Sequence, residues 1–283
     1  MEAVVSRKAR RFNFRASLCM PYAVFMILFV VFPLFVILAY AFTDENWAFT
    51  FDNWGTIFAT ATTWKTIGTT FIISACSTLG CLLIAYPIAY LLANSKYNKN
   101  KILVYIFLLP MWINFVIRTI GLKDLLNNIS SLFGAGDLTS SNPYLAIVIG
   151  MIYDYLPFAI LPLYNQMLKL DKSQIEAAAD LGANPVQVFI KSIIPQTIPG
   201  IISACTMTFM PTMSSYVIAN KMSEGNKQII GSMIEDYFLK RTVEISNHVG
   251  SVVSLVMLLI VGVSLVAEKA LSKDPSEKKG EVF

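Results

Sequence analysis

Six apolar runs alternate with polar segments along this chain. They cover residues 18–42, 67–93, 102–120, 143–168, 199–220 and 248–267. An α-helix needs about 20 predominantly apolar residues to cross the hydrocarbon core of a bilayer, and each run meets that requirement within a few residues. The pattern therefore predicts an all-α membrane protein with six transmembrane helices and with polar tails at residues 1–17 and 268–283.

The polar segment 171–195 lies between two apolar runs and contains the signals of a short helix. Asp171 followed three residues later by Gln174 is typical of a capping box, which predicts a helix over residues 175–181. Gly182 then suits the left-handed residue that follows the end of a helix. The predicted helix is short and has small residues on one face, so we expect a partner to hold it.

A second helix signal follows directly in the same segment. Asn184 is a good N-cap residue, Pro185 fits the first turn of a helix, and Gln187 completes another capping box. We expect this second helix to end at Pro195. The whole segment is thus predicted to be a hairpin of two helices joined by a glycine turn.

Composition agrees with a membrane protein and charge gives it an orientation. Of 283 residues, 55% are hydrophobic and 14% are charged, whereas soluble domains have about 25% charged residues. Of the 22 Lys and Arg residues, 15 lie in segments 1–17, 94–101, 169–191 and 268–283. Because loops on the cytoplasmic side carry an excess of Lys and Arg, we expect both termini and the hairpin to be cytoplasmic.

Three polar segments, 43–65, 121–142 and 221–247, then fall on the outer side. In the third of them, apolar residues recur at helical spacing from Ile229 to Phe238, which predicts an amphipathic helix at the outer surface. Two roles stay open for this helix: packing against the rim of the bundle, and docking of an extracytoplasmic protein.

The hairpin segment resembles the EAA loop of ABC-type importer permeases. The residues that carry the resemblance are Glu176, Ala177, Ala178, Gly182 and Pro195. The pattern usually has Ile and Leu where this chain has Ser192 and Ile194. The resemblance implies a type-1 ABC importer permease fold over residues 18–267, in a bacterial cytoplasmic membrane, with 171–195 as the loop that couples it to a separate ATPase subunit.

Further segments resemble the permeases of spermidine/putrescine importers, and among these the first of the two permease subunits. They are Leu109–Asn114, Ile117–Arg118, Gly121–Leu122, Leu156–Phe158, Leu161–Tyr164, Ile230–Gly231, Tyr237–Leu239 and the segment 247–251. The resemblance implies three kinds of partner: a pair of ABC ATPase subunits, a second related permease subunit, and an extracytoplasmic polyamine-binding protein.

The sequence gives no sign of catalysis. It has one histidine, His248, and four cysteines without metal-ligand spacing, and it lacks the glycine-rich phosphate-binding loop of ATPases. We therefore expect no catalytic residues, metal, cofactor or nucleic acid, and we expect ATP to be hydrolysed by a partner chain.

Asp154 is the one charged residue deep inside an apolar run, near the bilayer midplane. A carboxylate there costs about 2.5–3.5 kcal/mol on insertion scales and usually faces a cavity or a partner. One interpretation is a translocation path that attracts a cation, aided by aromatic faces. The other is a packing carboxylate, paired with a hydroxyl or with Arg118. The candidate path residues are Asp154, Tyr153, Tyr155, Trp112 and Asn114.

Together these features predict a permease subunit of an ATP-driven importer that works by alternating access, with polyamines as the expected substrates. An importer for another small solute is the first alternative. An autonomous channel or secondary transporter is the second, although it would leave the hairpin 171–195 without a function. A membrane enzyme would need a catalytic set that the sequence lacks.

The topology can be tested with single cysteines in a cysteine-free background. We expect a membrane-impermeant thiol reagent to label cysteines that replace Asn53, Asn127 and Asn226 in intact cells, because these positions lie outside. A cysteine that replaces Lys172 should react only after the cells are opened. External labelling at position 172 would contradict the predicted orientation.

Overall fold

Long apolar helices make up most of the structure. The computed structural model describes residues 20–93, 102–134, 136–239 and 247–271. Within these ranges the chain forms helices and one isolated bridge between Thr43 and Phe49, and no strand occurs. Five helices there are long and apolar enough to cross a membrane, or six if one bent pair counts as a span.

The long helices have the following bounds. The first joins α2 (Met20–Met26), a π turn η1 (Ile27–Val31) and α3 (Phe32–Ala41). The next two are α5 (Ala61–Ala93) and α9 (Pro143–Met167). The fourth joins α11 (Pro185–Val188), a π turn η3 (Phe189–Ile193) and α12 (Ile194–Ser214), and the last is α15 (Asn247–Leu271).

Shorter helices connect these elements. They are α4 (Asp52–Ala59), α6 (Leu103–Leu108), the 3₁₀ turn η2 (Leu109–Trp112), α7 (Phe115–Leu132), α8 (Leu138–Ser141), α10 (Lys172–Asp180), α13 (Tyr216–Met222) and α14 (Ile230–Leu239).

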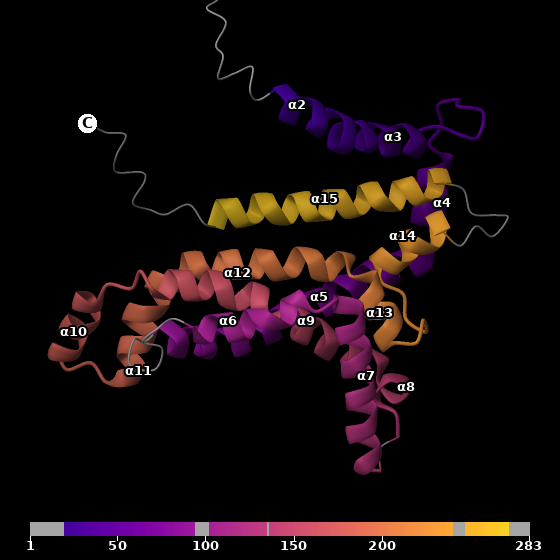
Figure 1. Cartoon of the computed structure of the whole chain (residues 1–283). Helices are drawn as coiled ribbons and strands as arrows, with labels where there is room; N and C mark the ends of the chain where they lie inside the picture. The colour runs from indigo at the N-terminus through magenta and orange to yellow at the C-terminus, as the bar shows by residue number, and fades with distance from the viewer. Residues whose placement is uncertain (1–19, 94–101, 135, 240–246, 272–283) are drawn as a thin grey trace, which may run out of the picture.

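The long helices lie side by side in one bundle (Figure 1). The α2–α3 helix packs on α15, α15 contacts α12, and α12 packs on both α5 and α9. The most extensive contact is the one between α5 and α9. At one end of the bundle α10 and α11 project outward, and α2 begins and α15 ends at that same end (Figure 1). The hairpin and the two outermost helix ends thus share one side of the bundle.

Small side chains allow α5 and α9 to approach closely. The buried positions of α5 recur every three or four residues and include Ser77, Cys81, Ala85 and Ala89. At Gly80 an added Cβ would lie 2.4 Å from Cδ1 of Ile152 on α9. In a bilayer the association of helices depends on close packing, because lipid offers as apolar a surface as a neighbouring helix does. This small-residue face therefore holds the centre of the bundle together.

The apolar run 102–120, for which we expected one span, breaks in the middle. α6 and η2 end at Trp112, and α7 leaves at an angle of 99° to them. Pro110 lacks the N–H that would continue the helix, and Asn114 caps a new helix by accepting the N–H of Val116 at 2.9 Å. Residues 121–132, which we expected in an outer loop, are helical, because α7 continues to Leu132. Their position outside the membrane stays a prediction.

The second helix of the hairpin also differs from the prediction. It does not end at Pro195 but continues from Pro185 to Ser214. The π turn η3 lies directly before Pro195 and accommodates a residue that cannot donate a backbone hydrogen bond. The helix instead breaks at Ser215, after Pro211, and α13 follows.

The amphipathic helix expected over residues 229–238 is present as α14. Its first four residues, Ile230–Met233, are buried, and it contacts α15, α12 and α13. Gly231 lies so close to α12 that an added Cβ would be 2.6 Å from the carbonyl oxygen of Ser214. Of the two roles left open, packing on the rim of the bundle is confirmed.

Candidate functional site

The first candidate site is the hairpin made by α10 and α11. Asp171 caps α10, since its side chain accepts the N–H of Ser173 at 3.0 Å. The hydroxyl and the N–H of Ser173 hold the pKa of Asp171 below its usual value, because both stabilise the carboxylate. The helix begins at Lys172, three residues before the predicted start.

Gly182 ends α10 as the sequence predicts. Its φ is 84°, in the left-handed region that glycine adopts without strain. Its N–H donates to the carbonyl of Ala179 at 2.9 Å, and the N–H of Ala183 donates to the carbonyl of Ala178 at 3.2 Å. These two bonds form a Schellman motif. Within the described chain nothing lies within 4 Å of a Cβ built on Gly182, so the backbone alone selects glycine here.

The second capping box is confirmed. The Asn184 side chain accepts the N–H of Gln187 at 2.8 Å, and the Gln187 side chain accepts the N–H of Asn184 at 3.0 Å. The turn between α10 and α11 is thus fixed from both sides by local hydrogen bonds. We conclude that the turn between the two helices has a defined shape that local sequence sets.

Most of the hairpin surface, including an apolar residue at its tip, is exposed in this chain. α10 has no buried residue. Glu176, Ala177, Gly182 and Pro195 are exposed, and Ala178 is half-buried. Leu181 at the tip is 90% exposed. Apolar residues gathered on an exposed tip are typical of an interaction surface.

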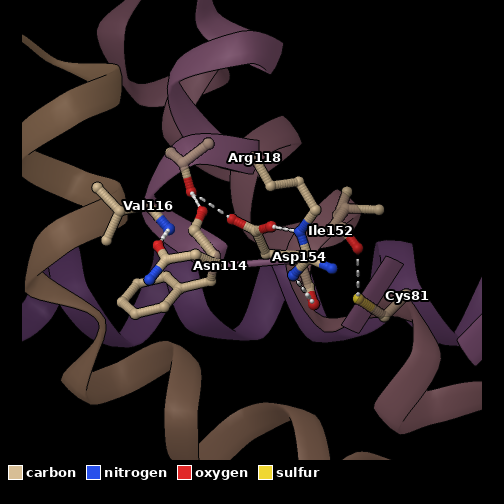
Figure 2. A network of polar contacts seen from close by, with 8 residues as sticks. Cys81, Asn114, Val116, Arg118, Ile152 and Asp154 are labelled. Atoms are coloured by element: carbon tan, nitrogen blue, oxygen red, sulfur yellow. Dashed lines mark hydrogen bonds and ion pairs between the residues drawn. The ribbon is translucent and has the colours of Figure 1, made fainter. Parts of the chain in front are cut away.

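The second candidate site surrounds Asp154, which is 1% exposed (Figure 2). Nε of Arg118 donates to Oδ1 of Asp154 at 2.6 Å, and the Thr119 hydroxyl donates to Oδ2 at 2.7 Å. Nη2 of Arg118 also donates to the backbone carbonyl of Asp154 at 3.2 Å. Both carboxylate oxygens are therefore satisfied by α7.

Arg118 is itself enclosed. Its side chain is 7% exposed, and its guanidinium carbon lies 5.4 Å from the centre of the Tyr153 ring, a distance typical of a cation–π contact. Its Nη1 atom is buried and has no hydrogen-bond partner among the described residues. The pair therefore joins α7 to α9 just after the break at Asn114, and an unpaired charge there would be costly.

These contacts match the second of our interpretations of Asp154, a packing carboxylate with a hydroxyl and Arg118 as partners. The role of Asp154 in a translocation path stays a prediction. Thr119 was missed, because the sequence does not tell which face of α7 points at α9. Its position next to Arg118 was the one available signal.

The other candidate path residues are distributed around this pair. Tyr155 is half-buried, and its hydroxyl donates to the carbonyl of Pro211 on α12 at 3.4 Å. Tyr153 is 41% exposed. Asn114 is exposed and caps α7, and Trp112 is 87% exposed at the end of η2. The structure thus brings Tyr153 and Asp154 to Arg118, while Tyr155 faces α12.

In the part of the chain that the structure describes, no group of three or more His, Cys, Asp or Glu residues is placed to hold a metal ion.

The arrangement of helices is that of ABC importer permeases. A chain of the bacterial ABC transporter that imports the acidic polysaccharide alginate matches 92% of this chain and 96% of its own length, with a TM-score of 0.71 and 17% identity. A chain of the MetNI methionine ABC transporter matches 74% of this chain and 94% of its own length, with a TM-score of 0.56 and 19% identity. The predicted class, an all-α ABC importer permease, is confirmed.

No family model matches the chain, but curated relatives do. The spermidine/putrescine transport system permease protein PotB of Haemophilus influenzae is 34% identical over 211 residues, which are 71% of this chain and 73% of that protein. PotB of Escherichia coli K12 is 34% identical over 198 residues, 67% of this chain and 71% of that protein. A PotB homolog of Mycoplasma pneumoniae is 38% identical over 149 residues, half of either chain. This chain belongs to the PotB family of ABC importer permeases, multi-pass transport subunits of the inner membrane whose ATPase activity resides in separate subunits.

The ion pair can be tested by removing one partner or both. We expect Asp154→Leu and Arg118→Met each to lower the free energy of unfolding by about 3–5 kcal/mol, because each leaves a buried charge uncompensated. The double variant should be about as stable as the unaltered protein. The measurement is thermal unfolding in mild detergent, with Ser254→Ala as a control, since that hydroxyl donates within α15 to Gly250. If the losses of the single variants simply add in the double variant, the two residues do not act as a pair.

Proposed function

We propose that this chain forms part of the translocation path of an importer for polyamines such as spermidine and putrescine. The observation that carries the proposal is the 34% identity to PotB over 71% of the chain. The described helices support it with a closely packed centre, where α5 meets α9 at small residues, and with helix breaks at residues 113–114 and 215. A carrier needs both, since it must keep its shape and also change it.

Transport would proceed by alternating access, in which the bundle has two packings that open to opposite sides. At the breaks at Asn114 and Ser215, the 3₁₀ turn η2 and the π turns η1 and η3, the described helices depart from regular geometry. Such departures let helix segments move relative to each other at small cost. ATP and substrate would shift the balance between the two packings by binding one of them more tightly.

The projecting hairpin would contact the ATPase subunits. Its exposed α10, with Glu176 and the apolar tip residue Leu181, offers a surface that a groove can enclose. We expect two ATPase subunits, one for this chain and one for a second, related permease subunit. We further propose that this end of the bundle and both termini are cytoplasmic, and that an extracytoplasmic polyamine-binding protein delivers substrate at the opposite end.

Asp154 would attract the cationic substrate in the translocation path, and its ion pair with Arg118 would control when it does so. A polyamine carries several ammonium groups, and moving them through a low-dielectric interior requires compensating negative charge. In the described packing Arg118 already neutralises Asp154. The carboxylate can attract a cation only in a packing in which the guanidinium has moved away, so this role is tied to alternating access.

The proposal is tested with the complex that copurifies with this chain, reconstituted into liposomes. We expect labelled spermidine or putrescine to enter in a saturable manner, and only when ATP is supplied to the ATPase subunits. A neutral solute of similar size should not enter. ATP-dependent uptake of a different solute alone would overturn the substrate assignment, and polyamine uptake without ATP would favour a channel or a secondary transporter.

The same assay separates the two roles of Asp154. The double variant Arg118→Met with Asp154→Leu keeps a neutral, packed interior. Slow polyamine uptake by this variant, with an intact complex, would support a path role. Uptake at the unaltered rate would leave Asp154 with a packing role only.

Two substitutions in the hairpin test the coupling role. Gly182→Val should cost about 1–3 kcal/mol locally, because a β-branched residue is strained at positive φ, and should misplace α10. Glu176→Lys reverses a charge on its exposed face. We expect both to abolish ATP-dependent uptake while the protein remains inserted in the membrane. Gly262→Val is the matched control, since a Cβ at Gly262 meets nothing within 4 Å in the described chain. Normal substrate-stimulated ATP turnover in both hairpin variants would contradict the proposal.

A further inference from the structure

The start of α10 is held by a residue of another helix. In a capping box, the residue at the third helical position accepts the N–H of the N-cap residue. In α10 the N-cap is Asp171 and the third position is Gln174, yet the N–H of Asp171 donates to Oε1 of Gln196 at 2.9 Å. In the neighbouring helix α11 the usual local bond is present, between Asn184 and Gln187. The cap of α10 is therefore completed by α12.

Gln196 makes further hydrogen bonds that reach α9. Nε2 of Gln166, at the end of α9, donates to the backbone carbonyl of Gln196 at 2.8 Å. Nε2 of Gln196 donates to the Ser192 hydroxyl at the long distance of 3.5 Å. One half-buried residue thus joins the end of α9, the start of α10 and the first turn of α12.

Close packing makes this joint stiff. A Cβ added to Gly200 of α12 would lie 2.5 Å from Cβ of Gln166. The backbone of α12 therefore contacts the Gln166 side chain of α9 one turn beyond Gln196. The adjacent Thr197 hydroxyl lies 2.9 Å from the Tyr86 hydroxyl on α5. Residues 196–200 are therefore fixed to both central helices of the bundle.

The other arm of the hairpin joins the bundle through the chain itself, and Phe189 of η3 packs against Tyr86 and Tyr90 on α5. Between α11 and Gln196 the chain passes through the π turn η3 and Pro195, both of which interrupt the regular hydrogen bonds of a helix. Since α10 buries none of its own residues, its hydrogen bond to Gln196 is a short, direct connection to the packed helices.

We propose that Gln196 is a positioning residue that transmits the movement of α10 to α9 and α12. The inference rests on the proposed function, which assigns the contact with the ATPases to α10. With the bond to Asp171 in place, the N-terminal end of α10 and the helices of the bundle move together. Without it, α10 can follow the ATPases while the bundle stays behind.

The test compares two substitutions in the reconstituted complex and measures substrate molecules imported per ATP hydrolysed. Gln196→Leu keeps the size of the side chain but removes the acceptor for the Asp171 N–H. We expect the ratio to fall by about fivefold, the lower end of the usual range for coupling between sites, with ATP turnover retained. Gln196→Glu keeps an acceptor oxygen, so its ratio should stay near that of the unaltered chain. Thr206→Val is the control, because that hydroxyl donates within α12 to Ile202.

The outcomes separate this inference from the proposed function. An unchanged ratio in Gln196→Leu would overturn the inference. This includes the case in which uptake and ATP turnover fall in proportion, which would indicate a structural role only. If the unaltered chain binds no ATPase subunit at all, the proposed function fails and this inference fails with it.

Discussion

Backbone hydrogen bonding in a medium without water is the constraint on which this structure depends. A carbonyl or N–H freed by a proline or a helix break cannot turn to lipid, so the protein has to supply its partner. Two helix breaks show such partners: Asn114 accepts from Val116 at the start of α7, and Tyr155 donates to the carbonyl of Pro211 near the end of α12. The side chains at these breaks are thus chosen by backbone chemistry before any role in transport.

The same reasoning explains why polar contacts are concentrated between particular helices. Arg118 satisfies both the carboxylate and the backbone carbonyl of Asp154, and Gln166 satisfies the backbone carbonyl of Gln196. One of these contacts joins α7 to α9 and the other joins α9 to α12. The central helix α9 is therefore tied to α7 near its middle and to α12 at its C-terminal end.

The local features of the structure could be predicted from the sequence, and the features that join distant segments could not. Gly182 and the Asn184 capping box follow from hydrogen bonds within a few residues, so residue type and spacing are enough. Gln196 contacts a residue 25 positions away, and nothing in its neighbourhood signals this. For Asp154 both interpretations were open, because its depth in the helix says nothing about which neighbour faces it.

The break at residues 113–114 shows an intermediate case. Pro110 and the N-cap residue Asn114 both favour a break here, whereas the apolar composition of residues 102–120 by itself predicts one span. The family, in contrast, was visible in the EAA pattern, because the spacing of Glu176, Gly182 and Pro195 carries more information than any single residue.

The exposure of the first helix has a consequence for the order in which the protein is assembled. From Met20 to Ala41 the chain buries one residue, Ala41, against the rest of the described structure. Lipid alone can therefore stabilise this helix, and its insertion need not wait for later segments. α9 is the opposite case, since the charge of Asp154 is compensated only once Arg118 is in place. Biogenesis should accordingly proceed from an autonomous edge helix to a centre that becomes stable only when its neighbours have arrived.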